Sequence, residues 1–255
     1  MPRPELTICR DAIDLATGAA RLIATTARDA IAQRGRFSLV LSGGSTPEKT
    51  YALLGNSDLG TELDWRSTFL FFGDERFVPS DDPDSNLGMA RRSLIERLAI
   101  PASHVFQMPT DGPDAADGAQ RYGETISQFF GVPGDSKPPP AFDLVLLGLG
   151  DDGHTASLFP GKPSLSVKDR WVTSSPPGRL PPPVDRITLT FPILNRARQV
   201  LFLVAGDKKA EIVRELLEDA PAVEKYPAAG ILPTDGKVTW LLDEAAAKLL
   251  KPQHL

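Results

Sequence analysis

Short apolar runs, each followed by a polar turn rich in glycine, constrain this chain more than any other feature of its sequence. The run 37–41 (FSLVL) leads into SGG, 68–72 (TFLFF) into GDER, and 142–147 (FDLVLL) into GLGDDGH. A fourth run, 200–205 (VLFLVA), leads into Gly206. Apolar runs of this length, bounded by turn residues, are typical of strands that are buried on both faces of a sheet.

Segments with helical periodicity separate these runs. Between residues 11 and 34 the apolar side chains recur every three or four positions, which predicts a long helix. Further helices are expected at 48–54, 86–98, 115–129 and 208–217, and further strands at 186–191 and 238–242. Strands that alternate with helices predict an α/β fold, in which helices cover both faces of a parallel sheet.

Two proline-rich pieces bear on the division into domains. Residues 133–140 and 176–183 are too stiff for a helix or a strand and indicate surface connections. We expect one domain over residues 1–255, with a small subdomain around 133–185 as the alternative.

Charge and cysteine content argue against several classes of function. The net charge of −5 provides no basic field for a nucleic acid, so an anionic ligand would need a few well-placed cations. Cys9 is the only cysteine, which fits a reducing compartment, and three scattered histidines argue against a zinc site.

The N-terminus lacks the apolar core of a signal peptide, and no uncharged apolar run approaches the ~20 residues that span a bilayer. We expect a cytoplasmic protein, a monomer or weak homodimer, without a metal or a membrane partner.

The turn at residues 42–47 (SGGSTP) is suited to an anion such as phosphate. Gly43 and Gly44 allow backbone N–H groups to approach the ligand, while Ser45 and Thr46 supply hydroxyl donors beside a predicted helix N-terminus. The alternative is a plain strand-to-helix turn with Thr46 as the N-cap. The turn matches neither the P-loop nor the dinucleotide fingerprint.

His154 is the strongest candidate for catalysis, because it follows a predicted strand and lies two residues after Asp152. A histidine can accept a proton near neutral pH, and a neighbouring carboxylate can fix its tautomer. The alternative is a structural histidine. Spacing alone does not show that the two side chains touch.

Five further polar residues are candidates for the same site. Asp74, Glu75 and Arg76 follow the strand at 68–72, and two carboxylates beside an arginine could simply be a surface ion pair. Asp74 is nevertheless a catalytic candidate, which could bind sugar hydroxyls or position a water molecule. Asn86 could contact a sugar hydroxyl or cap a helix. Arg186 and Lys209 could neutralise a phosphate, or each could be an ordinary surface charge. Because ligands bind at the carboxyl ends of parallel strands, we expect these turns to line one pocket.

The motifs, in their order along the chain, resemble those of the 6-phosphogluconolactonases. The matching segments are SGGSTP (42–47), GDERFVP (73–79), DSN (84–86), GLGDDGHTASLFPG (148–161), RITLT (186–190) and GDKKA (206–210). With residues 226–247 they extend over nearly the whole chain. The resemblance implies a Rossmann-like α/β fold similar to that of the glucosamine-6-phosphate deaminase superfamily. It also implies hydrolysis of 6-phosphogluconolactone to 6-phosphogluconate in the oxidative pentose phosphate pathway, with no organic cofactor.

By the same resemblance, the loop SGGST, Arg186 and Lys209 would hold the substrate phosphate, and His154 would act at the lactone. One alternative is a deaminase or sugar-phosphate isomerase, but deaminases carry a catalytic glutamate five residues after the histidine, where this chain has Phe159. The other is a sugar-phosphate sensor without catalysis. Such sensors usually adjoin a basic DNA-binding segment, for which this chain has neither the length nor the charge.

Overall fold

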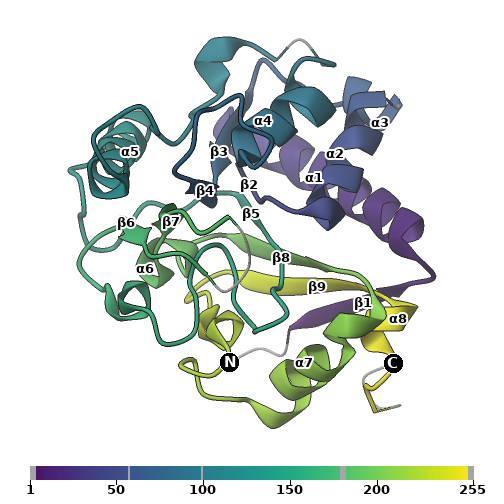
Figure 1. Ribbon diagram of the computed structural model, residues 1–255. Helices are drawn as coiled ribbons and strands as arrows, with labels where there is room; N and C mark the ends of the chain where they lie inside the picture. The colour runs from purple at the N-terminus through teal and green to yellow at the C-terminus, as the bar shows by residue number, and fades with distance from the viewer. Residues whose placement is uncertain (1–3, 57, 99, 179–181, 252–255) are drawn as a thin grey trace.

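The computed structural model describes residues 4–56, 58–98, 100–178 and 182–251 (Figure 1). Its strands are β1 Glu5–Cys9, β2 Phe37–Leu41, β3 Thr68–Phe72, β4 Asp74–Arg76, β5 Leu144–Leu147, β6 Val172–Ser175, β7 Arg186–Leu189, β8 Gln199–Val204 and β9 Lys237–Asp243. Its α-helices are α1 Ala12–Arg34, α2 Ser45–Asn56, α3 Asp58–Thr61, α4 Asn86–Ala90, α5 Ala115–Phe130, α6 Phe191–Leu194, α7 Ala210–Arg214 and α8 Glu244–Ala247. Short 3-10 turns are η2 Ala102–His104, η3 Pro163–Ser166, η4 Asp207–Lys209 and η6 Pro227–Gly230, and π-helical segments are η1 Arg91–Ile95 and η5 Glu215–Asp219.

The large sheet confirms the predicted α/β fold. Its six strands are all parallel and lie in the order β1-β9-β8-β5-β2-β3. The long helix α1 packs against β1, β2, β9 and α2, and Figure 1 shows α1 to α4 grouped together and α5 apart from them. Both α1 and α5 begin at aspartate caps, because Asp11 and Asp114 each accept hydrogen bonds from two backbone N–H groups of the first turn.

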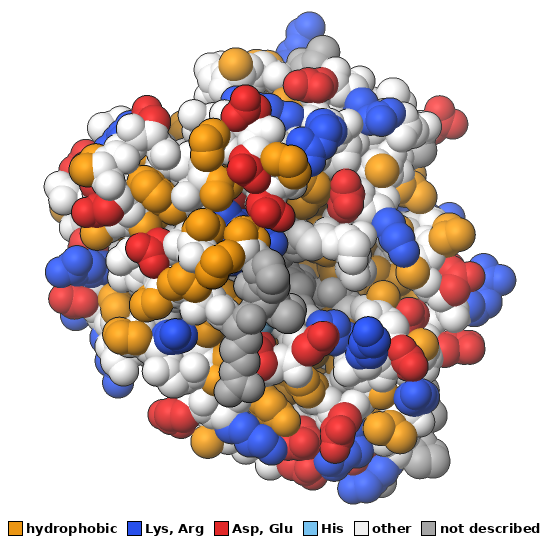
Figure 2. All heavy atoms as spheres, in the orientation of Figure 1, with side chains coloured by type: hydrophobic (Ala, Val, Ile, Leu, Met, Phe, Trp, Pro, Cys, Tyr) orange, Lys and Arg blue, Asp and Glu red, His pale blue; other side chains and the backbone are white. Residues whose placement is uncertain are grey.

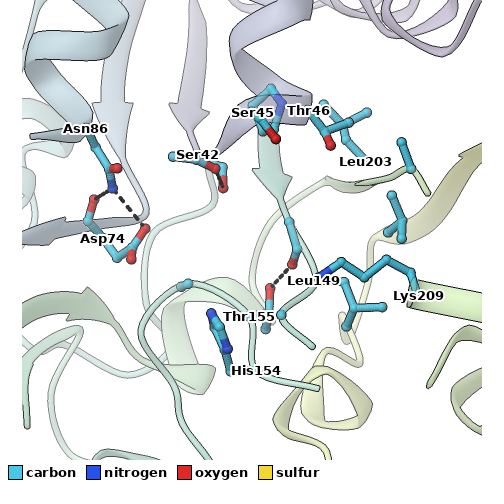
Figure 3. A pocket seen from close by; sticks show the side chains of 18 of the residues that line it. Ser42, Ser45, Thr46, Asp74, Asn86, Leu149, His154, Thr155, Leu203 and Lys209 are labelled. Carbon is cyan, nitrogen blue, oxygen red and sulfur yellow. Dashed lines mark hydrogen bonds between the residues drawn. The ribbon is translucent and has the colours of Figure 1, made fainter. Parts of the chain in front are cut away.

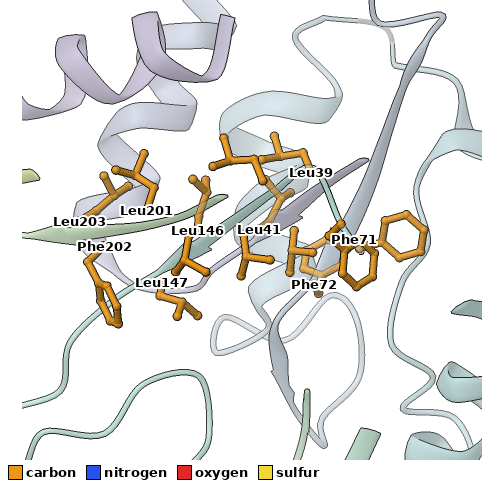
Figure 4. Close-up of a cluster of buried hydrophobic side chains, with 14 of the residues drawn as sticks. Leu39, Leu41, Phe71, Phe72, Leu146, Leu147, Leu201, Phe202 and Leu203 are labelled. Atoms are coloured by element: carbon orange, nitrogen blue, oxygen red, sulfur yellow. The ribbon is translucent and has the colours of Figure 1, made fainter. Parts of the chain in front are cut away.

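The core lies on the central strands of this sheet. Leu39, Leu41, Phe71, Leu146 and Phe202 are buried side by side, as Figure 4 shows. All residues of β2, β5 and β8 are buried, which explains why these strands are continuous apolar runs and not alternating ones.

The direction of chain connection reverses at β2. From β2 the chain continues to β3 at one side, whereas β5, β8 and β9 follow on the other side. Leu41 pairs with Phe72, and Val40 with Val145, so the turns after β2, β3 and β5 leave the sheet at one edge. In open α/β sheets such a reversal opens a crevice for a ligand.

A second sheet, which the sequence did not predict, lies beside the first. It is antiparallel, with the order β4-β7-β6, so the expected strand at 186–191 belongs here and not to the parallel sheet. Helix α5 packs against β6 and β7. Residues 133–140 form neither helix nor strand, as expected, and residues 179–181 of the second proline-rich piece lie outside the described residues.

Three predicted elements differ in detail. The helix expected at 86–98 is helical only to Ile95, with η1 as its second part. The one expected at 208–217 is divided into η4, α7 and η5. Helix α2 begins at Ser45, ahead of the expected start at Glu48. Of the helices that the structure describes, none is long and apolar enough to cross a membrane.

Candidate active site

A pocket of about 280 Å³ opens at the carboxyl edge of the large sheet (Figure 3). The turns after β2, β3 and β5 and the end of β8 line it, as predicted from the sequence for the first three. Its described wall consists of Ser42, Gly43, Gly44, Ser45, Thr46, Pro47, Asp74, Arg76, Asn86, Gly148, Leu149, Gly150, His154, Thr155, Ala156, Leu203, Val204, Ala205 and Lys209.

His154 and Asp152 form a hydrogen-bonded pair at this pocket. His154 Nδ1 lies 2.5 Å from Asp152 Oδ1, and the backbone N–H of His154 donates to the same oxygen at 3.1 Å. Burial raises the pKa of Asp152, but the hydrogen bonds and charge of His154 outweigh it and hold that pKa below its ordinary value. An ionised carboxylate only accepts hydrogen bonds, so Nδ1 carries a proton, and in the neutral form of the ring Nε2 is the nitrogen with the lone pair.

The imidazole is also held by its packing. The ring of Phe159 lies 4.6 Å from that of His154, centroid to centroid. On Gly150 a Cβ atom would come within 2.0 Å of His154 Nδ1, so only glycine allows this close approach. His154 is about one-quarter exposed, and in Figure 3 its ring lies at the floor of the pocket.

Asp74 and Asn86 form a second polar cluster. The side chain of Asn86 donates to the backbone carbonyl of Asp74 at 2.8 Å and to its Oδ1 at 3.4 Å, and Ser157 Oγ donates to Asp74 Oδ2 at 2.6 Å. Arg76 donates to Asn86 Oδ1. The alternative of a surface ion pair of Asp74 and Glu75 with Arg76 is wrong for the described residues, because Arg76 bonds to Asn86 and Glu75 is buried. The cap alternative for Asn86 is also wrong, since Ser85 is the N-cap of α4.

The glycine turn and Lys209 lie on another side of the pocket. Figure 3 shows Ser45, Thr46 and Lys209 across the pocket from Asp74 and Asn86. Thr46 lies within the first turn of α2, so it is not the cap that precedes the helix. Lys209 ends η4, just before α7, and its Nζ pairs with the exposed carboxylate of Asp151.

Arg186 is not among the described residues that line the pocket. It is 4% exposed, lies opposite Arg76 in the β4–β7 pairing, and donates from Nη2 to the carbonyl of Pro182 at 3.1 Å. Its Nη1 is buried and has no hydrogen-bond partner among the residues that the structure describes. Burial and the charge of Arg76 lower the pKa of this guanidinium. A phosphate-binding role for Arg186 stays a prediction.

Sequence reasoning did not assign several residues that shape the site. Leu203, Val204 and Ala205 line the pocket from the end of β8, where the sequence offers no polar signal. Ser157 is visible in the sequence only as a member of the histidine motif, and its contact with Asp74 depends on tertiary structure. Across the described ranges, no three His, Cys, Asp or Glu side chains gather as a potential metal site.

The fold and this pocket define a class of protein: Rossmann-like α/β proteins with a glycine- and hydroxyl-rich turn and a histidine motif at the switch point of the sheet. A family profile described as glucosamine-6-phosphate isomerases/6-phosphogluconolactonase matches residues 10–240. The chain belongs to this family.

Individual relatives agree with that assignment. A 6-phosphogluconolactonase from Synechocystis sp. is 43% identical over 230 residues, which are 90% of this chain and 91% of the relative. The solved structure of a 6-phosphogluconolactonase from Trypanosoma cruzi superposes with a TM-score of 0.86 at 32% identity, covering 98% and 97% of the two chains. A monomeric glucosamine-6-phosphate deaminase has the same fold, with a TM-score of 0.79 at 25% identity and coverage of 96% and 99%.

Proposed function

We propose that this protein hydrolyses 6-phospho-D-glucono-1,5-lactone to 6-phospho-D-gluconate. The observation that carries the proposal is the His154–Asp152 pair, which leaves a basic Nε2 at a pocket whose other side offers an anion-binding turn and Lys209. The names of relatives that are more than 40% identical support the same activity. The reaction is the second step of the oxidative pentose phosphate pathway.

The substrate would lie across the pocket with its phosphate away from His154. Backbone N–H groups of Gly43 and Gly44, the hydroxyls of Ser45 and Thr46, and Lys209 would hold the phosphate. Binding at this remote group would place the lactone carbonyl near Nε2, so that binding energy contributes to orientation. Asp74 would accept hydrogen bonds from the sugar hydroxyls or help to position the attacking water, and Asn86 would contact a sugar hydroxyl.

His154 would act as base and then as acid. Nε2 takes a proton from a water molecule as the water oxygen bonds to C1, giving a tetrahedral oxyanion and an imidazolium that Asp152 stabilises. Collapse re-forms the carbonyl, breaks the bond from C1 to the ring oxygen, and returns the proton to that oxygen. Arg76 or a backbone N–H group of a glycine turn would stabilise the oxyanion. The new carboxylic acid then releases its own proton to solvent.

The competing chemistries have less support. Phe159 occupies the position where deaminases carry their catalytic glutamate, and it packs against His154 with an apolar ring. Ser157 is a poor nucleophile here, because the residue is 1% exposed and its hydroxyl donates to Asp74. Direct attack by water therefore accounts for the site better than an acyl-enzyme does.

The test is the rate of acid release from freshly prepared 6-phosphogluconolactone, measured against an enzyme-free blank. The wild-type rate should exceed the blank. His154→Ala should lower kcat by roughly 100-fold or more, whereas Lys209→Ala should mainly raise KM. A wild-type rate equal to the blank would remove the lactonase proposal. Ammonia or a ketose phosphate as product would favour the deaminase or isomerase alternative, and phosphosugar binding without turnover would favour the sensor.

A further inference from the structure

Glu75 is a buried carboxylate next to the pocket that the proposed reaction does not use. It is 3% exposed, and no lysine or arginine in the described ranges forms an ion pair with it. Burial raises the pKa of this carboxyl, although the backbone N–H groups that bond to it act in the opposite direction. Burying a carboxylate without a cation beside it is costly, so its hydrogen bonds must offset the loss of hydration. The partners of those bonds show what Glu75 does in the fold.

The carboxylate holds one turn of the chain together. Glu75 Oε1 accepts the backbone N–H groups of Arg76 at 2.8 Å and of Asn86 at 2.7 Å. Its Oε2 accepts the N–H of Leu87 at 2.8 Å and the hydroxyl of Ser85 at 3.0 Å. Both oxygens thus bind the start of α4, ten to twelve residues further along the chain.

We call the four hydrogen bonds that Glu75 accepts the Glu75 clamp. The alternation of side chains along β4 explains how this clamp affects the pocket. Neighbouring side chains of β4 point to opposite faces, so Asp74 and Arg76 line the pocket while Glu75 points into the protein. From that buried side Glu75 fixes the backbone of Asn86, whose side chain returns to the pocket face.

Asn86 is the point at which three pocket groups meet. Its amide nitrogen donates to Asp74, and its oxygen accepts from Arg76. A Cβ atom on Gly43 would come within 2.0 Å of Asn86 Oδ1, so the anion-binding turn also packs closely against it. A small displacement of Asn86 would therefore move Asp74, Arg76 or the turn.

We propose that Glu75 is a positioning residue: its carboxylate fixes Asn86, and through Asn86 it aligns Asp74 and Arg76 with the substrate. It does not touch the substrate itself. The kinetic part of this inference rests on the proposed lactonase function, whereas the structural part does not.

The variant Glu75→Gln tests the inference, because the carboxamide keeps the size of the side chain but replaces one acceptor oxygen by an N–H donor. At least one backbone N–H group of the clamp then loses its acceptor. We expect faster hydrogen exchange at the amides of Asn86 and Leu87. We also expect kcat to fall by roughly tenfold or more, with KM less affected, because small misplacements of site groups are costly to rate.

A double-mutant cycle with Asn86→Ala separates positioning from general destabilisation. If Glu75 acts through Asn86, the Glu75→Gln/Asn86→Ala double variant should have nearly the same kcat as Asn86→Ala alone. Asp143→Asn is the matched control: Asp143 is also buried and accepts the N–H and hydroxyl of Ser38, but at the opposite edge of the sheet. It should lower stability and leave kcat and KM unchanged.

Each result decides the inference. Unchanged exchange at Asn86 and Leu87 in Glu75→Gln overturns it, whatever the reaction. Faster exchange with unchanged kcat, or fully additive losses in the cycle, also overturns the positioning role. If wild type does not hydrolyse the lactone, the proposed function fails separately, and the exchange measurement alone decides whether the clamp exists.

Discussion

At the scale of single residues, the proposed reaction depends on which nitrogen of His154 carries a proton. Asp152 decides this, because a carboxylate whose pKa is held low remains an acceptor at neutral pH. The lowered pKa also couples the pair to stability. Asp152 contributes its full share to the free energy of unfolding at pH values above its ordinary pKa in the unfolded chain. This contribution is lost as the pH falls through the lower pKa that Asp152 has in the folded protein.

The variant Asp152→Asn should therefore abolish most of the activity without disrupting the pocket. An amide can donate to Nδ1, which would place the proton on Nε2 and remove the base. We expect kcat to fall by roughly 100-fold at neutral pH. Asp151→Asn is the matched control, because Asp151 contacts Lys209 and not His154. It should act on KM and spare most of kcat; equal losses of kcat in both variants would contradict the role of Asp152.

At the scale of elements, two buried tyrosines fix the ends of neighbouring strands. Tyr51 of α2 accepts the backbone N–H of Ser42 and donates to its carbonyl, both at 2.9 Å. Tyr122 of α5 accepts the N–H of Phe72 at 2.8 Å, and its one O–H proton is shared between the carbonyls of Phe106 at 3.2 Å and Phe72 at 3.3 Å. Each hydroxyl thus satisfies backbone groups where a strand ends and a site turn begins.

Removing the Tyr51 hydroxyl should loosen the turn at residues 42–47, which we propose binds the phosphate. Tyr51→Phe leaves the N–H and carbonyl of Ser42 unpaired, so the free energy of unfolding should fall by about 1–3 kcal/mol. We expect KM to rise several-fold while kcat changes little, measured by steady-state kinetics together with denaturant unfolding. Tyr122→Phe should lose comparable stability but leave KM near the wild-type value. A KM that is equal in all three proteins would show that the turn does not need this anchor.

The composition of each strand decides whether it could be predicted from the sequence. The buried strands β2, β3, β5 and β8 could be predicted because a short apolar run between turn residues is typical of a buried strand. The strands β4 (DER) and β6 (VTSS) were not, because short polar strands are defined by their partners and not by local preference. The edge strand β1 was missed for a similar reason, since most of its residues are at least partly exposed.

Some residues of the candidate site could also be predicted from the sequence, whereas others depend on tertiary structure. Residues in turns after parallel strands could be placed together from the sequence, because those strands end at one edge. The burial of Glu75 and Arg186 depends on the antiparallel β4–β7 pairing, which no local pattern predicts. The clamp of Glu75 on Ser85, Asn86 and Leu87 is likewise a product of tertiary structure.

At the scale of the whole molecule, the overall charge does little to attract an anionic substrate. The net charge is −5, and Figure 2 shows acidic and basic side chains intermingled over one face. For the proposed phosphorylated substrate, the positive charge would have to come from local groups such as Lys209. The core is also shared across the chain, since Trp171 near the second proline-rich piece is 2% exposed and packs into the same cluster as β2 and β5.

The shared core predicts how the protein unfolds on heating. We propose that residues 1–255 unfold as one cooperative unit, so far-ultraviolet circular dichroism and tryptophan fluorescence should report one coincident transition.

A ligand that binds only the folded state raises the free energy of unfolding, by about 2.7 kcal/mol at 100 times its Kd. 6-Phosphogluconate should therefore raise the Tm of wild type, and the same concentration should raise that of Lys209→Ala much less. Two separate transitions would instead support a subdomain around residues 133–185, and an equal shift in both proteins would show that Lys209 does not bind the phosphate.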